Sequence, residues 1–169
     1  MIQQSIFNNQ PDGGALFSEC RYYRYALWRI WDHGGFNLGN YISFIGLNPS
    51  TATEYKNDNT VSKCIKYSKR WGYSGMFMLN AYAFRTPYPA LMKACKNPIG
   101  DENDRYIKDI ANRSSKVVLA WGNDCAPDRQ QEILNLINKE IFCLGINKNK
   151  SPKHPLYLKQ TLDLIPYET

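Results

Sequence analysis

The stretch Ile42-Ser-Phe-Ile-Gly-Leu-Asn-Pro-Ser-Thr51 decides how the rest of this sequence is interpreted. Its first half is a short apolar run with the length and composition of a buried β-strand. Its second half changes abruptly to residues that favour turns and helix caps. In open α/β sheets, ligands bind outside the carboxyl ends of the strands. The stretch therefore predicts either an ordinary strand-to-loop turn or, if other strands end in the same way, one wall of a binding site.

Three later apolar runs also have the character of strands, and predicted helices alternate with them. The strands are expected at residues 75–83, 116–122 and 140–145, and the helices at 60–71, 89–95, 101–113 and 127–139. The first helix is expected to be capped by Asn59 or Thr60. Strands that alternate with helices through short connections favour a parallel sheet. We therefore expect an α/β fold with three αβα layers around a central, mostly parallel four-stranded sheet.

An N-terminal antiparallel hairpin is expected beside this sheet. Residues 16–32 combine aromatic side chains with interleaved arginines, which suits a strand better than a helix. The glycine-rich residues 33–40 then predict a turn that returns the chain antiparallel into the strand at Ile42. With 169 residues, the chain is expected to form one domain over residues 1–169, loosely ordered over residues 1–14.

Composition narrows the classes of partner. The net charge of +6 is compatible with a ligand that carries phosphate, although it is modest among the 36 charged side chains. No apolar run approaches the roughly 20 residues of a membrane span, and the N-terminus lacks a signal peptide pattern. A cytoplasmic protein without a membrane partner is expected, and its oligomeric state is left open.

The five cysteines are widely spaced, and no pair has the spacing of a zinc site or a redox motif. We interpret them as reduced thiols, mostly buried. No metal and no cofactor are expected.

Polar residues follow each predicted strand, and the last strand leads to a loop that carries a histidine. If the strands lie side by side, Asn48, Asn80, Asn123 or Asp124, and His154 converge on one rim of the sheet. A few polar groups in an apolar scaffold are the usual form of a small-ligand site. An asparagine amide offers a donor and an acceptor, so it can pair with the edge of a nucleobase. His154 can donate to a developing oxyanion or simply bond to backbone.

The residues around this rim divide into expected ligand contacts and expected phosphate contacts. The ligand surface is expected to include Gly46, Leu47, Pro49, Ser50, Asn80, Tyr82, Phe84, Arg85 and Tyr157. Tyr55, Tyr82 and Phe84 are candidates for stacking on a base, with core packing as the alternative. Lys148, Lys150 and Lys153 are candidates for phosphate contacts, with a solvated loop as the alternative.

The motifs resemble those of the uracil-DNA glycosylase superfamily in kind and order. Gly46-Leu-Asn-Pro-Ser50 resembles the first motif of the mismatch-specific uracil/thymine glycosylases. The strand that ends at Asn80 resembles the one that carries the uracil-reading asparagine, and residues 117–122 are similar to the third core strand. His154-Pro-Leu-Tyr-Leu158 is similar to the His-Pro-Ser motif that closes the site, with Leu156 in place of the serine.

The resemblance implies roles for three residues. Asn48 would position the water that attacks the sugar C1′, Asn80 would recognise a flipped base, and His154 would stabilise charge that develops on it. The catalytic pair is thus expected to be Asn48 and His154. The most active branch of the superfamily has an aspartate at the position of Asn48, and an amide is a poor general base.

The whole chain also resembles an uncharacterised family of bacterial and phage proteins, domain of unknown function 1643. The likeness is carried by residues 22–31, 47–52, 58–60, 70–72, 80–85, 100–104 and 154–157. It implies a bacterial or phage-infected host cell but no established activity. Three functions stay open: an enzyme that excises or recognises a base in DNA or a nucleotide, a binding protein that sequesters a nucleotide or blocks a host factor, and an unrelated Rossmann-like domain.

Overall fold

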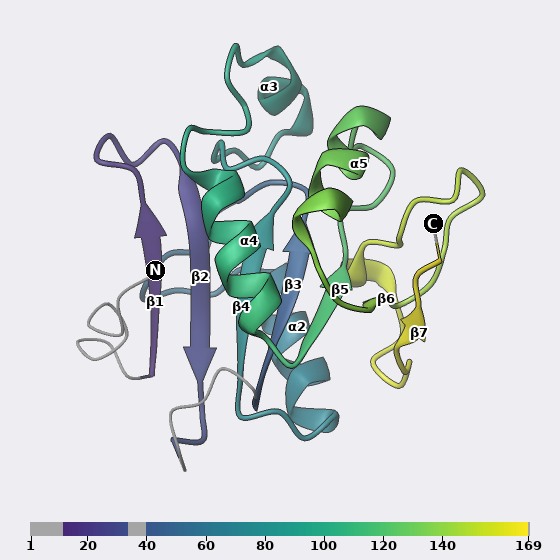
Figure 1. Ribbon diagram of the computed structural model, residues 1–169. Coiled ribbons are helices and arrows are strands. Elements are labelled where there is room, and N and C mark those ends of the chain that lie inside the picture. Colours follow the sequence, from purple (N-terminus) through teal and green to yellow (C-terminus); the bar gives the residue numbers. More distant parts are fainter. Residues whose placement is uncertain (1–11, 34–39, 169) are drawn as a thin grey trace.

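The computed structural model describes residues 12–33 and 40–168, which form a seven-stranded sheet with helices packed against it (Figure 1). The strands are β1 Gly13–Phe17, β2 Arg24–Ile30, β3 Tyr41–Gly46, β4 Gly75–Asn80, β5 Lys116–Leu119, β6 Ile141–Cys143 and β7 Ile165–Pro166. They lie in the order β1-β2-β4-β3-β5-β6-β7. The expected mixed α/β fold is confirmed, but the sheet has seven strands rather than four.

The apolar runs that predicted strands form the parallel part of the sheet. β4, β3, β5 and β6 are neighbours in this order, and each pair is parallel. Every residue of β3 and of β4 is buried, as expected for strands whose two faces are both covered. The register of β3 and β4 places Gly46 opposite Asn80, so the two predicted motifs end side by side.

The N-terminal segment differs from the prediction of one strand that turns into β3. It forms a hairpin of its own, in which β1 pairs antiparallel with β2, and β2 pairs antiparallel with β4 rather than with β3. The strand is interrupted because the Ser18 hydroxyl accepts from the Tyr23 amide and Arg21 has a φ of 60°, which makes a tight turn. Residues 1–11 and 34–39 of the expected loose start and glycine-rich turn lie outside the described residues, whereas Gly13 and Gly14 belong to β1.

The α-helices within the described residues are α2 Asn59–Arg70, α3 Pro89–Ala94, α4 Asn103–Arg113 and α5 Pro127–Leu136. Of these, α4 and α5 cover one face of the sheet and α2 covers the other, while α3 lies beyond the strand ends (Figure 1). α2 contributes Val61 and Tyr67 to one apolar cluster, while α4 and α5 contribute Ile107 and Ile133 to the other. The cap of α2 is Asp58 rather than Asn59 or Thr60, because its carboxylate accepts from the Val61 amide at 2.8 Å.

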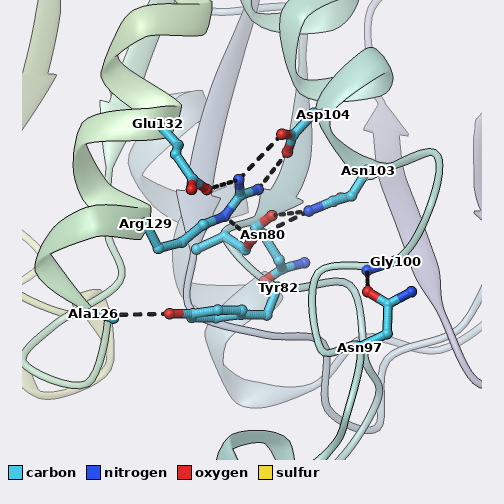
Figure 2. A network of polar contacts seen from close by, with 10 residues as sticks. Asn80, Tyr82, Asn97, Gly100, Asn103, Asp104, Ala126, Arg129 and Glu132 are labelled. Atoms are coloured by element: carbon cyan, nitrogen blue, oxygen red, sulfur yellow. Dashed lines mark hydrogen bonds and ion pairs between the residues drawn. The ribbon is translucent and has the colours of Figure 1, made fainter.

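A network of polar contacts holds the end of β4 from the side of α4 and α5 (Figure 2). The buried Asn103 side chain donates to the backbone carbonyls of Asn80 at 3.0 Å and Ala81 at 3.3 Å. The buried Arg129 guanidinium donates to the Ala81 carbonyl at 2.9 Å and pairs with Asp104 at 2.5 Å. These bonds satisfy backbone groups where the strand ends, so the chain direction after Asn80 is fixed.

We expect Asn103→Ala to lower the free energy of unfolding by about 2 kcal/mol, because two buried carbonyls lose a donor. Urea denaturation followed by circular dichroism measures the change. Asn135→Ala is the matched control, since Asn135 lies exposed on α5 and its side chain accepts from the exposed Gln131 side chain one turn earlier. The control should change stability by less than about 0.5 kcal/mol. Equal effects of the two substitutions would contradict the role of Asn103.

Candidate functional site

A cavity of about 640 Å³ lies at the carboxyl ends of the parallel strands. This volume is within the range of roughly 300–1,000 Å³ that small-molecule sites occupy. Its walls come from the ends of β3, β4 and β5, the first turn of α2, and the loop that follows β6. Of the residues predicted for the site, those that line it are Gly46, Leu47, Asn48, Ser50, Asn80, Lys153, His154 and Tyr157, together with both Asn123 and Asp124.

Asn48 lines the cavity and also holds a neighbouring loop. Its Nδ2 donates to the backbone carbonyls of Thr86 at 2.8 Å, Pro49 at 3.1 Å and Phe84 at 3.3 Å. Its Oδ1 has no hydrogen-bond partner among the described residues. The amide nitrogen therefore anchors the chain after β4, while the amide oxygen remains free to accept a hydrogen bond from water or a ligand.

Asn80 is 3% exposed and lines the same cavity. Its backbone carbonyl is held by Asn103, but its Nδ2 has no hydrogen-bond partner. A Cβ atom at Gly46 would lie 3.0 Å from the Asn80 Oδ1, so this close approach depends on glycine. The Asn80 amide is thus positioned by the sheet with its donor unused.

His154 caps the 3₁₀ turn η2 Pro155–Tyr157, and its Nδ1 accepts from the Leu156 amide at 3.2 Å. Burial lowers the pKa of His154 below its ordinary value of 6.5, and the negative charge of Asp58 opposes this shift only in part. The ring is therefore neutral at pH 7, and the acceptor role of Nδ1 puts the proton on Nε2. Nε2 has no partner among the described residues and can donate to a ligand.

Backbone geometry lets the histidine loop lie against the end of β5. Gly122 has a φ of 73°, and a Cβ there would lie 3.3 Å from the Cβ of His154. The Gly122 amide donates to the Pro152 carbonyl at 3.0 Å, which ties the loop to the strand. The sequence signal for this contact is the glycine that ends the apolar run.

Two charged residues of the cavity were not predicted from the sequence. Arg24, at the start of β2, is 1% exposed and donates from Nη1 to the Ala52 carbonyl at 2.9 Å. Asp58, the cap of α2, lines the cavity with a carboxylate that forms no ion pair among the described residues. The other carboxylate in the lining, Asp124, pairs with Lys93 at 2.6 Å. The signal that could have found Asp58 is its place as a cap just before the helix.

Three residues of the cavity lining carry a buried side-chain donor that has no hydrogen-bond partner among the described residues. These donors are Arg24 Nε, Asn80 Nδ2 and Trp121 Nε1. A buried donor left without an acceptor costs about 1–3 kcal/mol, so such groups are rare in folded proteins. A ligand in the cavity that brings acceptor atoms could pair with them, although unpartnered donors also occur away from the cavity, at Trp71, Arg85 and Gln160.

Several residues predicted to contact the ligand are not part of the cavity lining. They are Pro49, Tyr82, Phe84, Arg85, Lys148 and Lys150. The Tyr82 ring belongs to the core and its hydroxyl accepts from the Ala126 amide, and Phe84 packs edge-on against Tyr23. Arg85 lies over the Phe17 ring, while the stacking candidate Tyr55 is 88% exposed. The aromatic side chain that is both exposed and part of the lining is Tyr157.

Residues 12–33 and 40–168 contain no group of three or more His, Cys, Asp or Glu side chains arranged to hold a metal ion. None of the helices within these residues is long and apolar enough to cross a membrane.

Together, the fold and the cavity define an α/β protein with a small-ligand pocket at the carboxyl ends of parallel strands. The chain belongs to the family described as "Protein of unknown function (DUF1643)", which matches residues 24–156. This range begins at Arg24 and ends just after His154, so it spans both sides of the cavity. No curated protein and no solved structure matches the chain. The likeness to the uracil-DNA glycosylase superfamily stays a prediction from motifs.

We expect His154 to titrate below pH 6.5, because burial disfavours its charged form. Since the folded-state pKa is lower than the unfolded one, its contribution to stability is present above pH 6.5 and is lost as the pH falls through the folded pKa. Proton NMR titration of the ring signals, assigned with His154→Gln, measures the pKa. A midpoint at or above 6.5 would contradict the lowering of the His154 pKa by burial.

Proposed function

We propose that this protein binds a nucleobase in the cavity, in the manner of a uracil-DNA glycosylase with three αβα layers, and hydrolyses an N-glycosidic bond in DNA or a nucleotide. The observation that carries the proposal is the convergence of the unpartnered Asn80 amide, the free Asn48 oxygen and the neutral His154 ring on one cavity. These groups offer donors and acceptors of the kind that a nucleobase edge requires.

The roles follow from what each group can donate or accept. The Asn80 Nδ2 would donate to a carbonyl oxygen of the base. The Nε2–H of His154 would donate to the base as the bond between C1′ and nitrogen breaks and electrons move onto the ring. Water would attack C1′ and form the new C–O bond, with the Asn48 Oδ1 accepting one of its hydrogen bonds.

The proton released by that water needs a base, and the Asn48 amide cannot supply one. Asp58 is the carboxylate of the lining that forms no ion pair among the described residues, and one of its oxygens is used as the cap of α2. We assign it as the general base of the proposed reaction. This role places the carboxylate at the N-cap of α2 rather than in the motif after β3.

A second candidate function is binding without hydrolysis, as in a protein that sequesters a nucleotide or blocks a host factor. It is favoured by one observation: the Asn48 Nδ2 already serves three backbone carbonyls, so the side chain has a structural task that needs no chemistry. For a protein that sequesters a nucleotide, the two functions predict the same ligand and differ only in whether the glycosidic bond breaks.

Single-turnover assays with oligonucleotides that contain uracil, mismatched thymine or modified bases, and with the matching mononucleotides, separate the two functions. We expect base release that falls by about 10²–10⁴-fold in Asp58→Asn and by about 10²–10³-fold in His154→Gln. Asn135→Ala, far from the cavity, should keep the full rate.

Base release that persists unchanged in both variants would contradict the assigned roles. An absence of release together with saturable binding of the same compounds, weakened by Asn80→Ala, would establish the binding protein instead. If no base, nucleoside or nucleotide binds at all, both proposals are wrong.

A further inference from the structure

A β-bulge in the N-terminal hairpin determines which way Arg24 points. Leu16 pairs with Ala26, but the next residue of β1, Phe17, pairs with Arg24, so Tyr25 is an extra residue in β2. The Tyr25 ring stacks on Tyr106 of α4 at a centroid distance of 5.4 Å, on one side of the sheet. Bulges redirect side chains and are frequent beside functional sites.

Arg24 points the other way, toward the face that α2 covers. It donates to the carbonyl of Ala52, which belongs to the apolar cluster on the α2 side together with Val61. The same face carries the cavity end of β4, where Met78 and Asn80 both line the cavity. Without the bulge, strand alternation would have turned Arg24 toward α4.

The Arg24 guanidinium is a buried cation without an anionic partner. It is 1% exposed, its Nε has no acceptor, and it forms no ion pair among the described residues. Burial lowers the pKa of Arg24 to about 10, so the group stays charged at neutral pH. Asp58 favours the charged form, while Arg29 and Arg85 disfavour it. Charges buried without a partner are rare because their desolvation costs much free energy. An anion that enters the cavity would therefore interact strongly and favourably with the Arg24 guanidinium.

The first turn of α2 faces the same space. Thr60 and Val61 line the cavity, and the turn itself carries no acidic residue, although the carboxylate of its cap, Asp58, lines the cavity as well. The first N–H groups of a helix have no partner within it, and Asp58 caps the one at Val61. The unused N–H groups and the helix dipole favour an anion here. Lys153 lines the cavity as a second cation.

We propose that Arg24 and the first turn of α2 form a subsite for a phosphate group, and that the ligand of the cavity is a nucleoside monophosphate. The nucleoside part of this assignment rests on the proposed function, whereas the phosphate part rests on Arg24. Several free N–H groups of one guanidinium match the several oxygens of a phosphate better than the two of a carboxylate.

The burial of the Arg24 guanidinium favours a single nucleotide as the ligand over a nucleic acid strand. A phosphate can reach a guanidinium that is 1% exposed only by entering the cavity itself. A terminal phosphate brings one nucleoside with it, which a cavity of about 640 Å³ accommodates. A phosphodiester inside a nucleic acid strand would carry a nucleoside on each side, and the cavity would have to admit both.

Calorimetric titration of the wild-type protein with nucleosides, their 5′-monophosphates and inorganic phosphate tests the subsite. We expect the preferred monophosphate to bind at least tenfold more tightly than its nucleoside. Arg24→Met should abolish most of the preference for the monophosphate over the nucleoside while changing nucleoside affinity less than about threefold. Arg24→Lys should retain part of this preference. The control is Arg105→Met, an exposed arginine of α4. Melting curves establish whether each variant folds. If Arg24→Met does not fold, the preference of the wild-type protein for the monophosphate over the nucleoside serves as the test.

The outcomes separate this inference from the proposed function. Equal affinity of nucleoside and monophosphate would overturn the phosphate subsite and leave base binding intact. Phosphate binding that depends on Arg24, without any binding of nucleosides, would support the subsite and overturn the base-binding proposal. Tighter binding of an oligonucleotide without a terminal phosphate than of every monophosphate would overturn the monomer assignment.

Discussion

The pairing of Gly46 with Asn80, at the carboxyl ends of β3 and β4, is the constraint on which the cavity depends. The Asn80 Oδ1 lies where a Cβ of any other residue at position 46 would crowd it, at 3.0 Å. From the opposite side, Asn103 and Arg129 hold the carbonyls of Asn80 and Ala81. The strand end is thus fixed in its backbone, and one amide donor is left unpaired at the cavity wall. Because the backbone carbonyls of Asn80 and Ala81 are hydrogen-bonded, the Asn80 side chain keeps its position although its amide donor has no partner.

The cavity wall is less stable than an apolar wall would be, because each buried donor without an acceptor costs free energy. Arg24, Asn80 and Trp121 all contribute such donors. The two apolar clusters, which include the fully buried strands β3 and β4, provide the compensating stability. Polar groups that are fixed in position without a hydrogen-bond partner are characteristic of binding sites, where the ligand supplies the missing partners. Base binding and phosphate binding at Arg24 both depend on donors of the cavity residues that have no partner within the protein.

Much of the fold could be predicted because the parallel strands are continuous apolar runs that end in glycine or asparagine. Since the carboxyl ends of such strands meet at one edge, Asn48, Asn80 and His154 were expected together, and all three line the cavity. The hairpin was placed less well. A run of aromatics and arginines predicts a strand but does not say where it turns, and the turn at residues 18–22 depends on a local bond from the Tyr23 amide to the Ser18 hydroxyl. The same limit applies to Tyr82, whose ring packs in the core rather than at the cavity and whose hydroxyl accepts from the Ala126 amide, a contact between segments that no local pattern predicts.

The sequence by itself determined the parallel strands β3 to β6 and the helices α2 to α5, the burial of their apolar residues, and the polar residues that follow the strands. These properties follow from periodicity, turn chemistry and capping, and all of them act over a few residues. Only the tertiary structure decided that Arg24 joins the cavity, because one inserted residue in β2 reverses the side on which its guanidinium lies. It also brought the cap of α2 to the loop of His154, through the packing of α2 against the turn at residues 155–157. Strand register and helix packing depend on contacts between segments far apart in the chain, so no local pattern reveals them.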